Sequence, residues 1–378
     1  MAKYLKQPSL FAEVKEIRRF FKIPAKERGI VFYAEHAGYW PTFEGLIKEL
    51  QAAQKPLIYI TSDWRDRILT ADMPLITSVY SCKLLPLLMQ LIDSRIVIMT
   101  LSDLNNHSIK RSRYPLHYVY VFHALVSTHM MYSFGAFDHY DSVLCTGPHQ
   151  IKELRKQEEM YHLQRKNLIE AGYYRLERIM NAYTNHKEKN QPEKKTVLIA
   201  PSWGNQNVLE TCGHAIVRIL LAAGYNVIVR PHSETIKRSP DLIQKINEEF
   251  FEHPGFLLER SNENDHSMIV ADVLISDCSG ITLEYAFGTE RPVIFIDVPL
   301  KIKNARYQEL GIEPLEVALR SKIGKIVSPH NLESLPKVVR ELIDSTEAYG
   351  GSIRQLRNEW VFHIGNSSKI GANYISKL

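Results

Sequence analysis

The chain has 378 residues, 45% of them hydrophobic, and a formal net charge of +5. This length exceeds one ordinary hydrophobic core and predicts two α/β domains. The mild charge and the lack of a recognisable nucleic-acid module disfavour nucleic acid as a partner, but they allow anionic small molecules or an anionic membrane surface.

The sequence contains no apolar run of the roughly 18–20 residues that a membrane span needs. The best candidate, residues 84–101, is interrupted by Asp93, Ser94 and Arg95. The N-terminus lacks the continuous apolar core and cleavage site of a signal peptide. The four cysteines have no Cys-x-x-Cys spacing, so disulfides and a structural zinc are not expected. We expect a cytoplasmic protein.

Residues 8–23 predict an amphipathic helix with Leu10, Phe11, Phe20 and Phe21 among its apolar residues and several lysines and arginines around them. Two interpretations stay open. The helix could contact the anionic cytoplasmic face of the cell membrane, where each well-placed basic residue contributes roughly 1 kcal/mol. Alternatively, it packs on the first domain.

Polar residues follow several expected strands of the first domain. Glu35 and His36 come after a buried strand at 29–34, and His123 follows another at 118–122. Ligands of open α/β sheets bind at the carboxyl ends of strands, so these residues are candidates for acceptor binding or catalysis. A neutral imidazole there is a suitable general base, although His36 could instead cap a helix. His129 is expected to form a structural hydrogen bond.

A polar, charged stretch at 184–196 marks the expected linker, and a second series of strands begins at 197–200. The turn 201–206 contains a glycine and precedes a helix. The strand 226–229 ends in Arg230, Pro231 and His232, and the arginine and histidine could each approach an anionic ligand.

The residues 277–280, Asp-Cys-Ser-Gly, form a turn between a buried strand at 273–275 and a helix from Ile281. We expect Gly288 and Pro292 to end that helix, and a further strand at 293–296. The turn presents Ser279, Gly280 and backbone N–H groups at a helix N-terminus, which suits a phosphate.

The alternating pattern predicts an α/β protein with two Rossmann-like domains that face one another across a cleft. The expected limits are the N-terminal helix at 1–28, the first domain at 29–183, the linker at 184–196, and the second domain with its terminal helices at 197–378.

Five segments together resemble the CDP-glycerol glycerophosphotransferases of teichoic-acid and capsule synthesis: 200–203, 230–232, 271–280, 284–286 and 291–295. The resemblance implies the GT-B fold, with the acceptor in the N-terminal domain and the donor nucleotide in the C-terminal one. It implies transfer of glycerol phosphate from CDP-glycerol to a hydroxyl of a glycopolymer or its lipid-linked precursor, with release of CMP. Neither a cofactor nor a metal is implied.

The resemblance also implies roles for individual residues. His123 is the nearest match to the family's catalytic His-Gly-Thr stretch, but the glycine and the following lysine are missing, so His36 and His129 remain alternatives. His232, the other candidate catalytic residue, would stabilise the diphosphate together with Arg230. The remaining donor-binding candidates are Ser202, Asp277, Ser279, Gly280, Thr282 and Glu284.

Two other functions stay open. A GT-B glycosyltransferase or an epimerase that uses a UDP-sugar would share the diphosphate-binding turn. A nucleotide-binding scaffold for polymer export would bind a nucleotide without turnover.

Overall fold

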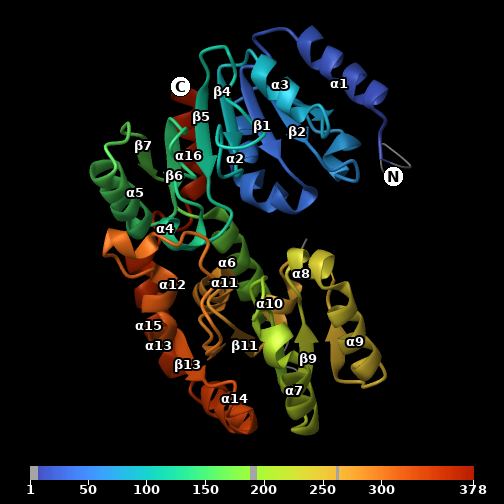
Figure 1. Ribbon diagram of the computed structural model, residues 1–378, viewed down its shortest axis with the longest axis vertical. Coiled ribbons are helices and arrows are strands. Elements are labelled where there is room, and N and C mark those ends of the chain that lie inside the picture. The colour runs from blue at the N-terminus through green and yellow to red at the C-terminus, as the bar shows by residue number, and fades with distance from the viewer. Residues whose placement is uncertain (1–6, 188–193, 261–263) are drawn as a thin grey trace. The chain divides into compact units, whose positions relative to one another are not determined.

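The computed structural model describes residues 7–187, 194–260 and 264–378, and the chain folds into two compact units. Unit 1 takes in the described residues of the ranges 1–123, 132–175 and 361–378. Unit 2 takes in those of 124–131 and 176–360. Each unit is built on one parallel sheet with helices packed against it (Figure 1).

The sheet of unit 1 has seven strands in the order β3-β2-β1-β4-β5-β6-β7. Their bounds are β1 (Ile30–Ala34), β2 (Leu57–Thr61), β3 (Ile76–Tyr80), β4 (Ile96–Met99), β5 (His117–Val121), β6 (Ser142–Cys145) and β7 (Asn167–Glu170). β1, β2 and β4 are buried along their whole length, as parallel strands covered on both faces are. The strand order reverses between β1 and β4, which is where such sheets bind ligands.

The helices of unit 1 include one from the C-terminal end of the chain. They are α1 (Leu10–Lys22), α2 (Trp40–Ala52), α3 (Leu85–Leu91), α5 (Pro148–Met160) and α16 (Ser367–Lys377), with short 3-10 segments η1 (Ala37–Tyr39) and η2 (Arg67–Leu69). α16 packs closely on α2 because two glycines lie at the contact. A Cβ on Gly371 would lie 2.5 Å from Leu46 Cδ2, and one on Gly45 would overlap Ser368 Oγ.

The sheet of unit 2 has six strands in the order β10-β9-β8-β11-β12-β13, the order of a dinucleotide-binding Rossmann fold. Their bounds are β8 (Thr196–Ile199), β9 (Asn226–Val229), β10 (Phe256–Leu258), β11 (Val273–Ser276), β12 (Val293–Ile296) and β13 (Gly324–Val327). The order reverses between β8 and β11, whose register pairs Val197 with Val273. The loops that follow these two strands therefore meet at the expected ligand position.

The helices of unit 2 lie before, between and after these strands in the sequence. They are α4 (Thr128–Met131), α6 (Tyr174–Lys187), α7 (Val208–Ala222), α8 (Ser233–Arg238), α9 (Pro240–Phe250), α10 (His266–Val270), α11 (Gly280–Thr289), α12 (Leu315–Ala318), α13 (Arg320–Ile323), α14 (Leu335–Asp344) and α15 (Thr346–Trp360), with η3 (Tyr307–Leu310) and η4 (Leu332–Ser334). The first two residues of α6 belong to unit 1.

The segment 124–131 follows β5 in the sequence but packs within unit 2. The backbone N–H and the hydroxyl of Ser127 donate to the two carboxylate oxygens of Glu316, at 2.9 and 2.7 Å, and both residues are buried. His129 Nε2 lies 2.9 Å from the carbonyl oxygen of Ile312, so this ring has the structural hydrogen bond expected for it.

The limits of the two units differ from the expected domain limits. Residues 188–193 of the expected linker lie outside the described residues, while 184–187 continue α6 and β8 begins at Thr196. Residues 361–378 were expected in the second domain, but they belong to unit 1 because α16 packs on α2.

The helix after the 277–280 turn ends at Thr289, between Gly288 and Pro292, the two residues expected to end it. Gly288 lies inside α11, where a Cβ would collide with Ile179 Cγ2. The glycine therefore serves the packing of α11 on α6, and the helix continues to Thr289.

Candidate functional site

Two loops are joined at the point in unit 2 where the strand order reverses. Asp277 follows β11, and its carboxylate accepts the backbone N–H of Ser202 at 2.8 Å and the Ser202 hydroxyl at 3.0 Å. Burial raises the pKa of Asp277, and the hydrogen bonds from Ser202 lower it in part. Ser202 and Asp277, both predicted donor-binding residues, are thus brought together, but they bind each other and fix the start of the loop after β8.

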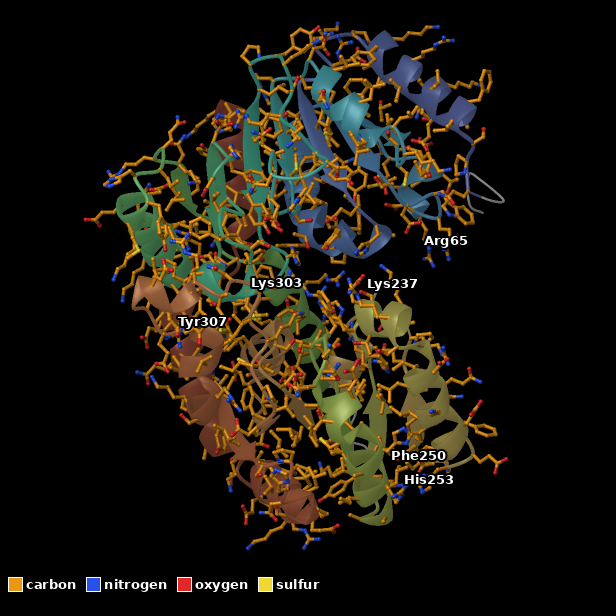
Figure 2. The ribbon with its side chains drawn as sticks, viewed as in Figure 1. Arg65, Lys237, Phe250, His253, Lys303 and Tyr307 are labelled. Carbon is orange, nitrogen blue, oxygen red and sulfur yellow. The ribbon has the colours of Figure 1, made fainter. Side chains whose placement is uncertain are left out.

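The next residue of that loop, Trp203, is surrounded by basic side chains. Lys301 Nζ lies 3.8 Å from the centroid of its ring, Arg238 Cζ 4.8 Å and Lys303 Nζ 6.0 Å. The His232 ring centroid lies 6.2 Å from that of Trp203. We call these five residues the Trp203 cluster. Figure 2 shows Lys303 at the same edge of unit 2 as Lys237, the neighbour of Arg238 on α8. A concentration of cations at a strand-end loop suits an anionic ligand.

The electrostatics of the cluster leave His232 neutral. Burial and the nearby charge of Lys301 lower the pKa of His232 to about 4. Its Nδ1 accepts the backbone N–H of Glu234 at 3.1 Å, so the proton of the neutral ring is on Nε2. His232 can therefore donate a hydrogen bond to an anion at neutral pH.

Glu234 positions the basic end of α8. Its carboxylate accepts from Lys237 Nζ and Arg238 Nε, each at 3.0 Å. These hydrogen bonds lower the pKa of Glu234. Arg238 is consequently held over the Trp203 ring from a second segment of the chain.

The turn before α11 has the geometry expected of a helix N-terminus. Ser279 is the N-cap in an extended conformation, and in the described part of the chain its hydroxyl makes no capping hydrogen bond. The Thr282 hydroxyl, by contrast, donates to the Ser279 carbonyl at 2.6 Å. A Cβ on Gly280 would lie 2.9 Å from Val126 Cγ1, so this glycine permits close packing of the segment 124–131. Glu284, one turn further on, is buried.

Arg230 has a different environment from the one predicted. The residue is buried, its Nη1 donates to Ser267 Oγ at 3.0 Å, and its Nε lies 3.8 Å from Glu259 Oε2. These contacts favour a role in positioning the end of β9 over direct contact with a ligand.

In unit 1, the two predicted histidines converge on Tyr39. His36 accepts the backbone N–H of Gly38 at 3.1 Å and caps η1, and its ring stacks on Tyr39 at 4.2 Å between centroids. The His123 ring meets the same tyrosine edge-on at 5.1 Å. The sequence alone did not indicate Tyr39 as their common neighbour.

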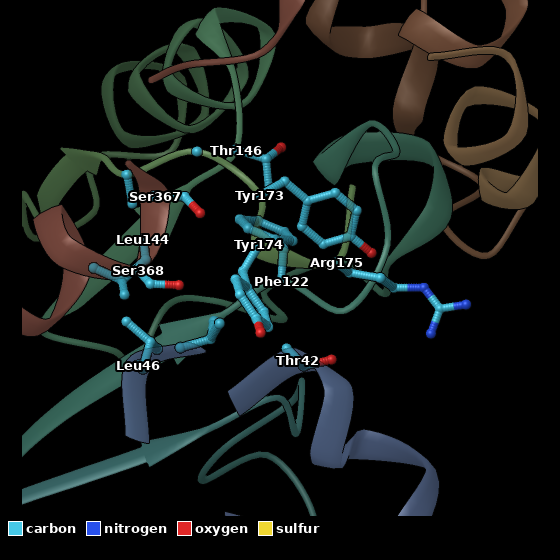
Figure 3. A pocket seen from close by; sticks show the side chains of 13 residues that line it. Thr42, Leu46, Phe122, Leu144, Thr146, Tyr173, Tyr174, Arg175, Ser367 and Ser368 are labelled. Atoms are coloured by element: carbon cyan, nitrogen blue, oxygen red, sulfur yellow. The ribbon is translucent and has the colours of Figure 1, made fainter. Parts of the chain in front are cut away.

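A pocket in unit 1 lies at the carboxyl ends of β5, β6 and β7 (Figure 3). Hydroxyl groups line it together with apolar side chains, and the Arg175 side chain points away from it. Its lining includes Ser368, which contacts the Gly45 position at the α2–α16 crossing. We interpret this pocket as part of the seam between α16 and the sheet.

The described ranges contain neither a metal centre nor a membrane-spanning helix. No group of three His, Cys, Asp or Glu side chains there could hold a metal ion. No helix among these residues is long and apolar enough to cross a membrane.

Comparisons with known proteins agree with this architecture. The family model described as CDP-Glycerol:Poly(glycerophosphate) glycerophosphotransferase matches residues 18–302. The wall teichoic acid polymerase TagF aligns with a TM-score of 0.59 at 15% identity, over 97% of this chain and 93% of that chain. No curated protein gives a significant sequence match.

Two further solved structures are similar. The S. aureus MnaA–UDP co-structure aligns with a TM-score of 0.59 at 14% identity, over 92% of this chain and 96% of that chain. A UDP-GlcNAc 2-epimerase from Neisseria meningitidis aligns with a TM-score of 0.56 at 13% identity, over 92% and 100%. Identities this low establish the fold alone, and the expected α/β fold of the GT-B type is confirmed. Because the family model covers most of its length, the chain belongs to the CDP-glycerol glycerophosphotransferase family of enzymes.

Proposed function

We propose that the protein transfers glycerol phosphate, or a related polyol phosphate, from CDP-glycerol to a hydroxyl of a cell-surface glycopolymer or its lipid-linked precursor. The observation that carries this proposal is the Trp203 cluster at the strand-order reversal of unit 2, in a chain of this family. Cations and a neutral N–H donor at that position suit the diphosphate of a nucleotide donor.

In the proposed reaction, the acceptor oxygen bonds to the phosphorus that carries the glycerol, and the bond from that phosphorus to CMP breaks. The acceptor's proton passes to His123, with His36 as the alternative base. Phosphoryl transfer depends chiefly on alignment and on neutralising charge, so the donor-binding residues carry much of the catalysis.

The donor residues fall into three groups. We propose that Ser279, the N–H groups at the start of α11, and His232 Nε2 contact the diphosphate. A second group holds the surrounding loops: Ser202, Asp277, Gly280 and Thr282. This role is supported by the hydrogen bonds between Ser202 and Asp277, by the bond from Thr282 to Ser279, and by the packing of Gly280 on Val126. Arg230 and Glu284 are buried, and we propose that they position neighbouring residues instead of contacting the donor.

The test is release of CMP from CDP-glycerol by the purified protein, in the presence and absence of a lipid extract that contains polyol-phosphate acceptors. We expect release that depends on the extract. His123→Gln should lose about 10²–10⁴ in rate and His232→Ala about 10²–10³. His214→Gln is the matched control, since His214 is on α7 and binds Glu249 instead. Turnover of UDP-GlcNAc instead of CDP-glycerol would favour the UDP-sugar enzymes, and nucleotide binding without turnover would favour the scaffold.

We also propose that α1 contacts an anionic membrane surface, which would bring a lipid-linked acceptor to the enzyme. Phe11 is 79% exposed and Leu10 51%, and the exposed basic residues Lys15 and Arg18 lie on the same helix. The helix also packs on unit 1, since Glu13 accepts the backbone N–H groups of residues 82–84 at 2.9–3.2 Å.

Deleting α1 would therefore also remove a cap from α3, so point variants test the membrane contact more sharply. Phe11→Ser and Leu10→Ser together should weaken binding to vesicles that contain phosphatidylglycerol by about tenfold or more, while Glu13 keeps the helix in place. Unchanged vesicle binding by that variant would eliminate this contact. Phe251→Ser, at another exposed phenylalanine, is the control.

A further inference from the structure

Lys301 is a half-buried lysine in the loop after β12, at the centre of the Trp203 cluster. Its Nζ lies 3.8 Å from the centroid of the Trp203 ring, and Arg238 approaches the same ring from α8. The face of an indole attracts a cation without neutralising it, so the ring can hold the lysine in place while its charge remains available to a ligand.

The charged groups that act on Lys301 come from its own loop, from α8 and from the loop after β11. Lys303 on its own loop and Arg238 on α8 repel it, whereas Asp277 after β11 and Glu234 on α8 attract it. Both carboxylates already have other partners: Asp277 accepts two hydrogen bonds from Ser202, and Glu234 binds Lys237 and Arg238. The remaining neighbour, His232, is neutral.

This environment disfavours the charged form of the lysine. Burial and the charge of Lys303 lower the pKa of Lys301 to about 7, and the two carboxylates offset only part of that change. Near neutral pH, the neutral form of the amine is therefore well populated in the unliganded protein.

We propose that Lys301 binds the diphosphate of the nucleotide donor and takes up a proton as the donor arrives. This inference rests on the proposed function, because it takes CDP-glycerol as the donor. Two negative charges placed against the amine favour its charged form, and a diphosphate diester has no group of its own that titrates near neutral pH. Trp203 and the loop that Asp277 fixes hold Lys301 ready for this contact.

The sign of the pH dependence follows from this coupling. The bound donor raises the pKa of Lys301 above its unliganded value of about 7. Donor affinity should thus be constant well below that pH, where Lys301 is already charged. Above it, affinity should fall by up to about tenfold per pH unit, because each binding event must then add a proton.

The experiment is calorimetric titration of CDP-glycerol into the full chain at about pH 8, in buffers with different ionisation enthalpies, so that proton uptake is measured beside affinity. Wild type should take up about 0.5–1 proton. Lys301→Arg should bind within a few-fold of wild type without proton uptake, since a guanidinium stays charged. Lys301→Met should bind about 10- to 100-fold more weakly.

Lys245→Met is the matched control, because Lys245 is an exposed lysine on α9 of the same unit, and it should behave as wild type. Thermal unfolding shows whether the Lys301→Met variant folds. This variant should be at least as stable as wild type, because the change removes a half-buried cation from a group of like charges. If wild type binds CDP-glycerol but Lys301→Arg takes up the same proton, or Lys301→Met binds equally well, the inference is wrong and the proposed function stands. If wild type does not bind CDP-glycerol, the proposed function itself fails.

Discussion

The bond between Ser127 and Glu316 is the contact that we expect to hold the segment 124–131 within unit 2. Ser127→Ala removes the hydroxyl donor 2.7 Å from the carboxylate and keeps the backbone donor at 2.9 Å. Both residues are almost fully buried, and a hydrogen bond to a charged group contributes about 1.5–3 kcal/mol, so we expect a loss of about 2 kcal/mol in the free energy of unfolding. Glu316→Ala leaves both donors of Ser127 without their acceptor and should lower the free energy of unfolding by about 2–6 kcal/mol.

A double-mutant cycle separates this bond from other effects of the two changes. Guanidinium unfolding of wild type, both single variants and the double variant should give a coupling energy of about 1.5–3 kcal/mol. Ser352→Ala is the control, because its hydroxyl donates to the Tyr349 carbonyl at an exposed position, and it should change stability by less than about 0.5 kcal/mol. A coupling energy below about 0.5 kcal/mol would mean that the bond contributes no more than an exposed one and does not hold the segment 124–131 in place.

The other predictions concern packing and the donor site. Gly371→Ala should destabilise the protein by about 1–3 kcal/mol in thermal unfolding, because the new Cβ meets Leu46. Gly351→Ala, in open space on α15, is the control and should be neutral or stabilising. Equal effects of the two changes would contradict the α2–α16 contact. Asp277→Asn removes a charge that raises the pKa of Lys301, so calorimetry should show that donor affinity begins to fall at a lower pH than in wild type. An unchanged pH profile would mean that the charge of Asp277 does not act on Lys301. His232→Gln should retain more CMP release than His232→Ala, since a neutral donor is what the site uses; equal losses would argue against that role.

The sequence predicted the interior strands β1, β5, β8, β9, β11 and β12, and it missed the outer strands. β3 and β7 are the edges of the first sheet, and β10 and β13 are the edges of the second. Edge strands are covered incompletely, so polar residues interrupt β3, β7 and β13, and Asn167–Glu170 even begins and ends with exposed polar residues. β10 is apolar, but it has only three residues. The sequence also offered no local signal that α16 returns to unit 1, because that depends on a contact between distant glycines.

For the candidate site, the strand-end rule located the right loops but not the roles of their side chains. Arg230 lies at the end of β9 as predicted, yet whether an arginine turns inward to Ser267 or outward to a ligand depends on tertiary packing. Trp203 lies in one of the family-like segments, but the cations around it come from separate parts of the chain. Lys301 could have been found, since it follows β12 just as Ser279 follows β11.

The role proposed for the Trp203 cluster is to hold the diphosphate of CDP-glycerol. A crystal structure of the protein with CDP-glycerol bound would show where the diphosphate lies. We predict diphosphate oxygens within about 3 Å of Lys301 Nζ and His232 Nε2, with Ser279 at the same ligand. A diphosphate bound elsewhere, with the Trp203 cluster unchanged and in contact with solvent alone, would rule out this role of the cluster.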